Sequence, residues 1–60
     1  MREDLPKDPA MLLSVVNTKL RDFYFSLEDF CQAEAVDGLE LMERLATIDY
    51  HYNREKNQFE

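Results

Sequence analysis

The chain is poor in the residues that usually cross-link a small protein. Its 60 residues include one cysteine, one histidine, one glycine and no tryptophan. One cysteine excludes an internal disulfide, and one cysteine with one histidine cannot supply the four ligands of a structural zinc site. A chain of this length buries only about 60% of its unfolded surface, and such scaffolds often gain stability by oligomerising. We therefore expect a homodimer without metals or cofactors.

Positive charge is also scarce. Seven basic residues stand against 13 acidic ones, which gives a net charge of −6. This balance disfavours nucleic acid as the main partner, because binding to phosphates needs clustered Lys and Arg. It also disfavours anionic membranes, and no apolar run approaches the ~20 residues that span a bilayer. Together with a polar N-terminal stretch and a lone thiol, these features predict a cytoplasmic protein.

The largest block of apolar residues lies between residues 8 and 23 and predicts one long amphipathic helix over about 9–24. Asp8 is a suitable N-cap, and Pro9 suits the first helical position. At about 100° per residue, four apolar side chains fall on one stripe that should be buried. The stripe consists of Leu12, Val16, Leu20 and Phe23.

The apolar arc of this helix is wider than a one-sided surface helix needs, because Met11 and Val15 extend it on the other side. Two interpretations remain open. Either other helices of the same chain cover this extra face, or Met11 and Val15 form a contact with a second chain. These two residues are our candidate dimer contact.

The rest of the chain predicts an arm, two more helices and a hairpin. Residues 1–7 read as an extended arm, in which Leu5 is expected to pack against the long helix. Helices are expected over about 27–34 and 38–47. After the 38–47 helix, apolar and polar residues alternate, which predicts a hairpin over about 49–59. The fold class is mostly α: a single three-helix, helix-turn-helix-like domain with a short C-terminal β-hairpin.

Local signals refine the two shorter helices. Ser26 and Asp37 are predicted N-caps, each followed three residues later by an acid. Leu39 and Met42 are expected to widen the buried stripe of the second of these helices. Glu34 falls near the apolar face of the first one, and this is understandable only if the helix ends there and the side chain turns outward.

The outer face of the 38–47 helix is the candidate surface for a partner. A helix that reads DNA usually presents hydrogen-bond donors to base edges. This one offers Glu40, Glu43 and Arg44. We therefore predict a small non-enzymatic protein-interaction module that acts as a homodimer, with an unknown protein partner that this acidic face attracts.

The hairpin supports an alternative function. Its predicted turn carries Asn53, Arg54, Lys56 and Asn57, which are suitable donors for phosphates or bases. On this alternative the protein is a winged-helix-like regulator that contacts nucleic acid through the hairpin.

Catalysis finds little support in the sequence. No phosphate-binding loop, metal-ligand spacing or nucleophile motif is present. His51 and Asp49 are close enough in sequence to form a pair, but an exposed polar pair is the simpler interpretation. Cys31 lies in an apolar stripe and is interpreted as a buried structural thiol. We predict no catalytic residues.

Two pairs of polar residues have several possible roles. Asn17 and Arg21 lie one turn apart on the back of the long helix, and Asn57 and Gln58 lie near the chain end. They hydrogen-bond their neighbours, hold the tail against the long helix, or form a polar contact site.

Three segments carry a resemblance to a known family: LPKDPAMLLSVVNTKLRD, SLEDFC and the closing NQF. They resemble a family of short bacterial proteins that is catalogued only as a domain of unknown function. The resemblance covers about residues 5–59 and implies a small cytoplasmic protein. It implies no activity, ligand or partner.

Overall fold

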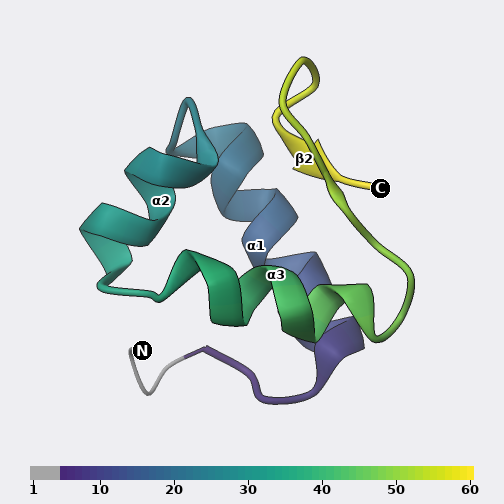
Figure 1. The fold of residues 1–60 in the computed structure, drawn as a ribbon. Helices are drawn as coiled ribbons and strands as arrows, with labels where there is room; N and C mark the ends of the chain where they lie inside the picture. The colour runs from purple at the N-terminus through teal and green to yellow at the C-terminus, as the bar shows by residue number, and fades with distance from the viewer. Residues whose placement is uncertain (1–4) are drawn as a thin grey trace.

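The computed structural model describes residues 5–60 as three helices followed by two short strands (Figure 1). The elements are α1 (Pro9–Asp22), α2 (Leu27–Glu34), α3 (Gly38–Ala46), β1 (Tyr52–Asn53) and β2 (Gln58–Phe59). The two strands form one antiparallel hairpin. The predicted fold class, mostly α with a short C-terminal β-hairpin, is confirmed.

Side-chain caps set the starts of the helices. Asp8 accepts a hydrogen bond from the backbone N–H of Met11 at 3.1 Å, and Ser26 accepts one from Asp29 at 3.0 Å. Asp37 caps α3 by accepting from two backbone N–H groups of its first turn. Each cap satisfies donors that have no partner within the helix. The three predicted N-caps are therefore confirmed.

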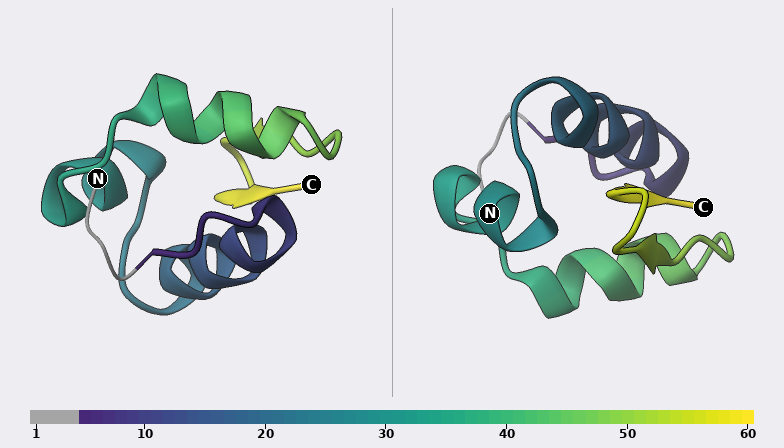
Figure 2. Two further views of the ribbon diagram at one scale, coloured as in Figure 1. Left: turned by 90° about the horizontal axis from the view of Figure 1, so that it is seen from below. Right: turned by 90° about the horizontal axis from the view of Figure 1, so that it is seen from above.

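The core is built around the central stripe of α1. Leu12, Val16 and Leu20 are buried, and α1 contacts α2, α3 and β2. In both views of Figure 2 the strand β2 lies between α1 and α3. Much of the wide apolar arc of α1 is thus covered by its own chain. The other buried apolar residues are Leu5, Leu27, Phe30, Val36, Leu41, Leu45 and Phe59.

Phe23 was expected in the buried stripe of α1, but its side chain is 72% exposed. The helix ends at Asp22, and Phe23 is its C-cap, so the chain has already left helical geometry there. Tyr24 turns inward instead, and its ring packs edge-on against Phe30 with 5.5 Å between centroids. A helical period cannot be extended past the residue at which the helix ends.

The C-terminal strand is hydrogen-bonded to the back of α1. The Asn17 amide donates to the backbone C=O of Phe59 at 3.0 Å and accepts from the N–H of Phe59 at 2.8 Å. The Asn57 amide donates to the carbonyls of Leu20 and Tyr24. Of the roles considered for these asparagines, holding the tail against the long helix is the one observed.

The hairpin is shorter than the alternation of residues suggests. Ile48 and Asp49 continue the last turn of α3 through backbone hydrogen bonds, so the first strand begins at Tyr52 and not near residue 49 as predicted. Asp49 then adopts a left-handed conformation, with φ of 65°, which redirects the chain. The hairpin pairs Tyr52 with Phe59. Just outside the strands, His51 and Glu60 exchange two backbone hydrogen bonds.

Glu34 is buried, with 8% of its surface exposed, and does not turn outward as expected. Its Oε2 accepts hydrogen bonds from the Tyr24 hydroxyl at 2.8 Å and from Lys19 Nζ at 3.3 Å. A charged group can be buried when it is paired and hydrogen-bonded in this way. Glu34 therefore links the end of α2 to the end of α1.

The arm is described from Leu5 onward. Leu5 is buried in the core, as expected. The expectation for the preceding positions, 1–4, falls outside the described residues.

Candidate functional site

A groove of about 410 Å³ lies between α2, the start of α3 and β1. Apolar side chains supply much of its surface, and charged residues stand at its rim. It is lined by Leu27, Glu28, Cys31, Asp37, Gly38, Leu39, Met42, Tyr52 and Arg54.

Leu39 and Met42 were expected to widen the buried stripe of α3, yet they are 71% and 38% exposed. Leu39 precedes Leu41 by two residues, or about 200° around the helix, which places it almost opposite the buried stripe. Met42 lies at the edge of that stripe. Sequence reasoning missed these residues as site residues, although the angular position of Leu39 was a readable signal.

Cys31 forms part of the groove wall and is half-buried, not fully buried as predicted. Burial raises the pKa of its thiol, and the nearby carboxylates of Glu28 and Asp37 raise this pKa further. The part of the groove beside Cys31 therefore combines partial burial with two acidic neighbours.

The two helices approach closely beside Cys31. A methyl group added at Gly38 would lie 3.5 Å from Cys31 Sγ, an ordinary van der Waals distance. One end of the groove carries an exposed ion pair, in which Arg54 donates to Glu28 Oε2 at 3.2 Å.

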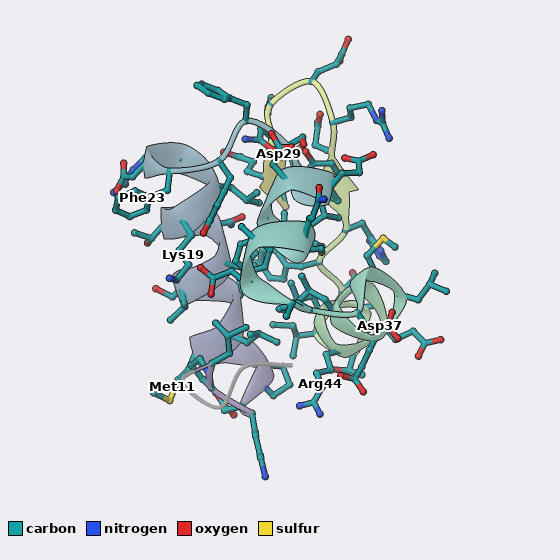
Figure 3. The ribbon with its side chains drawn as sticks, turned by 90° about the vertical axis from the view of Figure 1, so that its left-hand side faces the viewer. Met11, Lys19, Phe23, Asp29, Asp37 and Arg44 are labelled. Atoms are coloured by element: carbon teal, nitrogen blue, oxygen red, sulfur yellow. The ribbon has the colours of Figure 1, made fainter. Side chains whose placement is uncertain are left out.

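The three residues of the predicted partner face separate into two directions. Glu40 and Glu43 are exposed on α3. Glu43 follows Leu39 by about 40° around the helix, so this acid borders the apolar surface of the groove. Arg44 is half-buried on the other flank, and its guanidinium donates to the backbone carbonyl of Lys7 at 3.3 Å (Figure 3).

The predicted dimer contact is only partly available. Met11 is 62% exposed, but Val15 is half-buried and packs against the core of its own chain. In Figure 3 Met11 and Phe23 mark the two ends of the exposed flank of α1. The exposed apolar surface of this helix is therefore divided between its ends.

The residues of the predicted nucleic-acid contact are held by partners in the same chain. Lys56 Nζ lies 3.6 Å from Glu60, and the Asn53 amide donates to Glu60 at 2.7 Å. The hydrogen bond from Asn53 is the main cause of the lowered pKa of the Glu60 carboxyl. Arg54 is in the ion pair across the groove, and the Asn57 amide is directed toward α1, not outward.

His51 and Asp49 do come together, with 3.4 Å between His51 Nε2 and Asp49 Oδ1, and both side chains are exposed. Within residues 5–60, no cluster of three His, Cys, Asp or Glu side chains is arranged to hold a metal ion. None of the helices in this part of the chain combines the length and the apolar character needed to cross a membrane.

The molecule is thus a small three-helix protein closed by a C-terminal hairpin, with an acid-rimmed apolar groove. It belongs to the family described as Domain of unknown function (DUF4250), whose model matches residues 6–59. Comparisons with curated proteins and with solved structures gave no match. The family description assigns no activity, so the chemistry of the groove is the main guide to function.

Proposed function

We propose that this protein is a small non-enzymatic interaction module that binds a basic, amphipathic segment of a partner protein in the groove between α2 and α3. The observation that carries the proposal is the exposure of Leu39, at the mouth of the groove and beside Met42. Adjoining exposed apolar residues with a polar rim are typical of interaction surfaces.

The size and lining of the groove suit one anchoring side chain of the partner. Its volume of about 410 Å³ falls in the range of about 300–1,000 Å³ that is usual for binding clefts. An apolar side chain would pack between Leu39, Met42 and Tyr52. An amphipathic helix laid along α3 could present such an anchor, as in other helix-in-groove complexes.

Charge gives the partner its second property. Asp37 and Glu43 line or border the apolar surface, Glu28 at its rim is paired with Arg54, and the chain carries a net charge of −6. Lys and Arg on both sides of the anchor would meet complementary potential. This complementarity raises the association rate more than the final affinity, and added salt should reduce it.

We also propose that the module acts as a homodimer. The short chain builds its core without disulfides, because its only cysteine is free. Such small cores commonly gain stability from a second copy.

A winged-helix-like regulator is the second candidate. The observation in its favour is that the side chains of Arg54 and Lys56 remain well exposed at the hairpin turn. Their charges are offset by Glu28 and Glu60, which weakens the attraction for phosphates. A gel-shift assay at low salt with duplex and single-stranded DNA distinguishes this candidate, since only a nucleic-acid regulator would retard either probe.

The groove is tested by comparing variants in a pull-down from cell lysate. The double variant Leu39→Ala/Met42→Ala should lose a partner that the unchanged chain retains, because the apolar anchor loses its contacts. Met11→Ala is the matched control, since it removes an exposed methionine of α1 that does not line the groove. Retention of every partner by the double variant would contradict the proposal.

Charge and occupancy are tested on the same partner. Glu40→Lys/Glu43→Lys should slow its association and reduce its salt dependence, because it reverses two negative charges on α3 beside the groove. Cys31 is the only thiol of the chain and lies in the groove wall, so a bound partner should slow its alkylation. An unchanged alkylation rate in the saturated complex would place the partner elsewhere.

A further inference from the structure

A second apolar surface lies at the loop between α1 and α2. Phe23 is 72% exposed and Phe25 is 93% exposed, whereas Tyr24 between them turns inward onto Phe30. Two phenylalanine side chains thus project from three consecutive positions. We call the segment Phe23–Phe25 the aromatic ridge.

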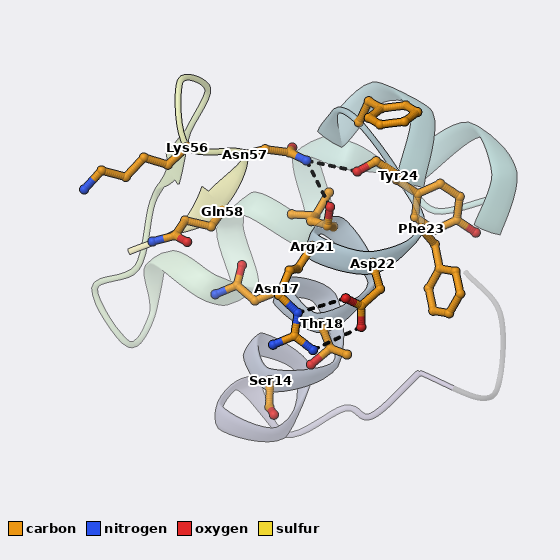
Figure 4. Close-up of a pocket in the computed structure, with 12 residues that line it drawn as sticks. Ser14, Asn17, Thr18, Arg21, Asp22, Phe23, Tyr24, Lys56, Asn57 and Gln58 are labelled. Carbon is orange, nitrogen blue, oxygen red and sulfur yellow. Dashed lines mark hydrogen bonds and ion pairs between the residues drawn. The ribbon is translucent and has the colours of Figure 1, made fainter.

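Hollows lie on both sides of the aromatic ridge. One of about 640 Å³ lies between the back of α1 and the hairpin (Figure 4), and one of about 370 Å³ lies toward α2. All three residues of the ridge line both hollows. A projecting ring and cavities that can receive such a ring therefore belong to one continuous patch.

The charges that line these hollows cancel. Arg21 and Lys56 contribute two positive charges, and Asp22 and Asp29 contribute two negative ones. The chain as a whole carries −6. A second acidic chain can approach this neutral patch with less repulsion than it would meet at the rim of the groove.

We propose that a second copy of this chain docks on the aromatic ridge, with Phe25 of each copy inserted into a hollow of the other. A two-fold contact uses the same patch on both copies, so that patch must contain both the projection and the cavity. The inference rests on the homodimer of the proposed function and assigns its contact. It replaces Met11 and Val15, because Val15 is already engaged in its own core.

The size of the molecule limits the strength of this contact. A standard interface takes about 800 Å² from each partner, which would be about a fifth of the 4183 Å² surface of this chain. That is a large share for a patch centred on three residues, so we expect a weak dimer whose population depends on concentration. Such a dimer stabilises the fold only at concentrations near or above its Kd.

Light scattering and sedimentation over a range of concentrations test this dimer. The mass should rise from 7.2 kDa toward twice that value as concentration increases. Phe25→Ala should weaken self-association by about tenfold or more, as expected for an aromatic residue at the centre of an interface. Because Phe25 is almost fully exposed, circular dichroism should show that the variant keeps its fold. Met11→Ala is the control and should leave self-association unchanged.

Nuclear magnetic resonance locates the contact. Amide shifts that depend on concentration should cluster at the aromatic ridge and at Gln32 and Ala33, which line the hollow toward α2. A monomeric mass at all concentrations would overturn the inference, as would shifts confined to Met11 and Val15. Binding of Phe25 to phosphatidylcholine vesicles without self-association would also overturn it, by assigning the ridge to lipid.

The proposal for the groove and the proposal for the aromatic ridge can be refuted independently. If Phe25→Ala abolishes dimerisation but the protein still captures a partner through Leu39, both proposals stand. If the chain is monomeric and the groove variants still lose the partner, only the dimer fails.

Discussion

Single polar side chains join the C-terminal strand and the end of α2 to the region of α1. Asn17 satisfies both the N–H and the C=O of Phe59, and Glu34 accepts hydrogen bonds from Lys19 in α1 and from Tyr24 just after α1. Within residues 5–60, every buried side-chain nitrogen and oxygen atom has a hydrogen-bond partner. Leaving a buried polar group without a partner costs more free energy than a formed hydrogen bond contributes. These contacts therefore favour this packing of the elements over arrangements that would break them.

Asn17→Ala should lower the free energy of unfolding by about 2–3 kcal/mol, because it removes two hydrogen bonds and leaves part-buried backbone groups of Phe59 without their partner. Thr18→Ala, at an exposed neighbouring position, should change it by no more than about 0.5 kcal/mol. Urea unfolding followed by circular dichroism measures both. Equal effects of the two substitutions would show that Asn17 does not hold the tail.

Alkylation of Cys31 should require a higher pH in the folded protein than in the unfolded chain. Burial and neighbouring carboxylates raise the pKa of the folded thiol, so the thiolate that reacts forms later. For the same reason, any contribution of Cys31 to stability is present below the pKa of the unfolded thiol and is lost as pH rises through the folded pKa. Iodoacetamide rates measured against pH, with and without urea, give the two midpoints. A folded midpoint at or below the unfolded one would contradict this prediction.

Sequence alone located Asn17, Asn57 and Glu34 as residues that needed an explanation, but it could not choose their partners. Glu34 lies ten residues from Tyr24 and Asn17 lies 42 from Phe59. Contacts of this kind depend on how whole elements pack. A helical period reports only which face a residue occupies.

At the scale of elements, the sequence predicted the starts of the helices better than their ends. The starts carry their own side-chain caps at Asp8, Ser26 and Asp37. The end of α2 is made by Ala35 in a left-handed conformation, with φ of 57°. Alanine gives no sequence signal for that geometry, which glycine or asparagine usually adopts.

Ala35→Gly should raise the free energy of unfolding by up to about 1 kcal/mol, because glycine adopts the left-handed region without a Cβ clash. Ala33→Gly, two residues earlier inside α2, should lower it by about 1 kcal/mol because glycine is a poor helix former. Thermal unfolding compares the pair. A loss of stability in both variants would show that the C-cap of α2 carries no relievable strain.

Gly38→Ala should also stabilise the protein, by about 0.5–1 kcal/mol, since Gly38 opens α3 with an ordinary helical conformation. The added methyl group meets Cys31 Sγ at 3.5 Å, so it fits without a clash. Urea unfolding provides the measurement. A lower stability would mean that the contact between α2 and α3 is tighter than this distance indicates.

For the whole molecule, the wide apolar arc of α1 left open whether its own chain or a second chain covers it. Its own chain covers much of the arc, although Met11 stays exposed. What the sequence could not supply is which apolar residues remain outside. Phe23 and Leu39 were both assigned to buried stripes, and both are exposed because one lies past a helix end and the other opposite the core. These exceptions define the aromatic ridge and the groove.

Two surfaces of different character therefore remain on one small protein. The groove between α2 and α3 combines apolar side chains with acidic neighbours, whereas the hollows beside the aromatic ridge have balanced charge. Their electrostatics separate the partners that each would accept, a basic segment at the groove and a second acidic chain at the ridge.

The groove is tested most directly by titrating the isotope-labelled protein with a synthetic amphipathic helix that carries leucines on one face and lysines beside them. Saturable shifts should be largest at Cys31, Leu39 and Met42, and a matched peptide with glutamates in place of the lysines should bind far more weakly. An absence of saturable shifts in the groove, or equal binding of the two peptides, would contradict the proposed function.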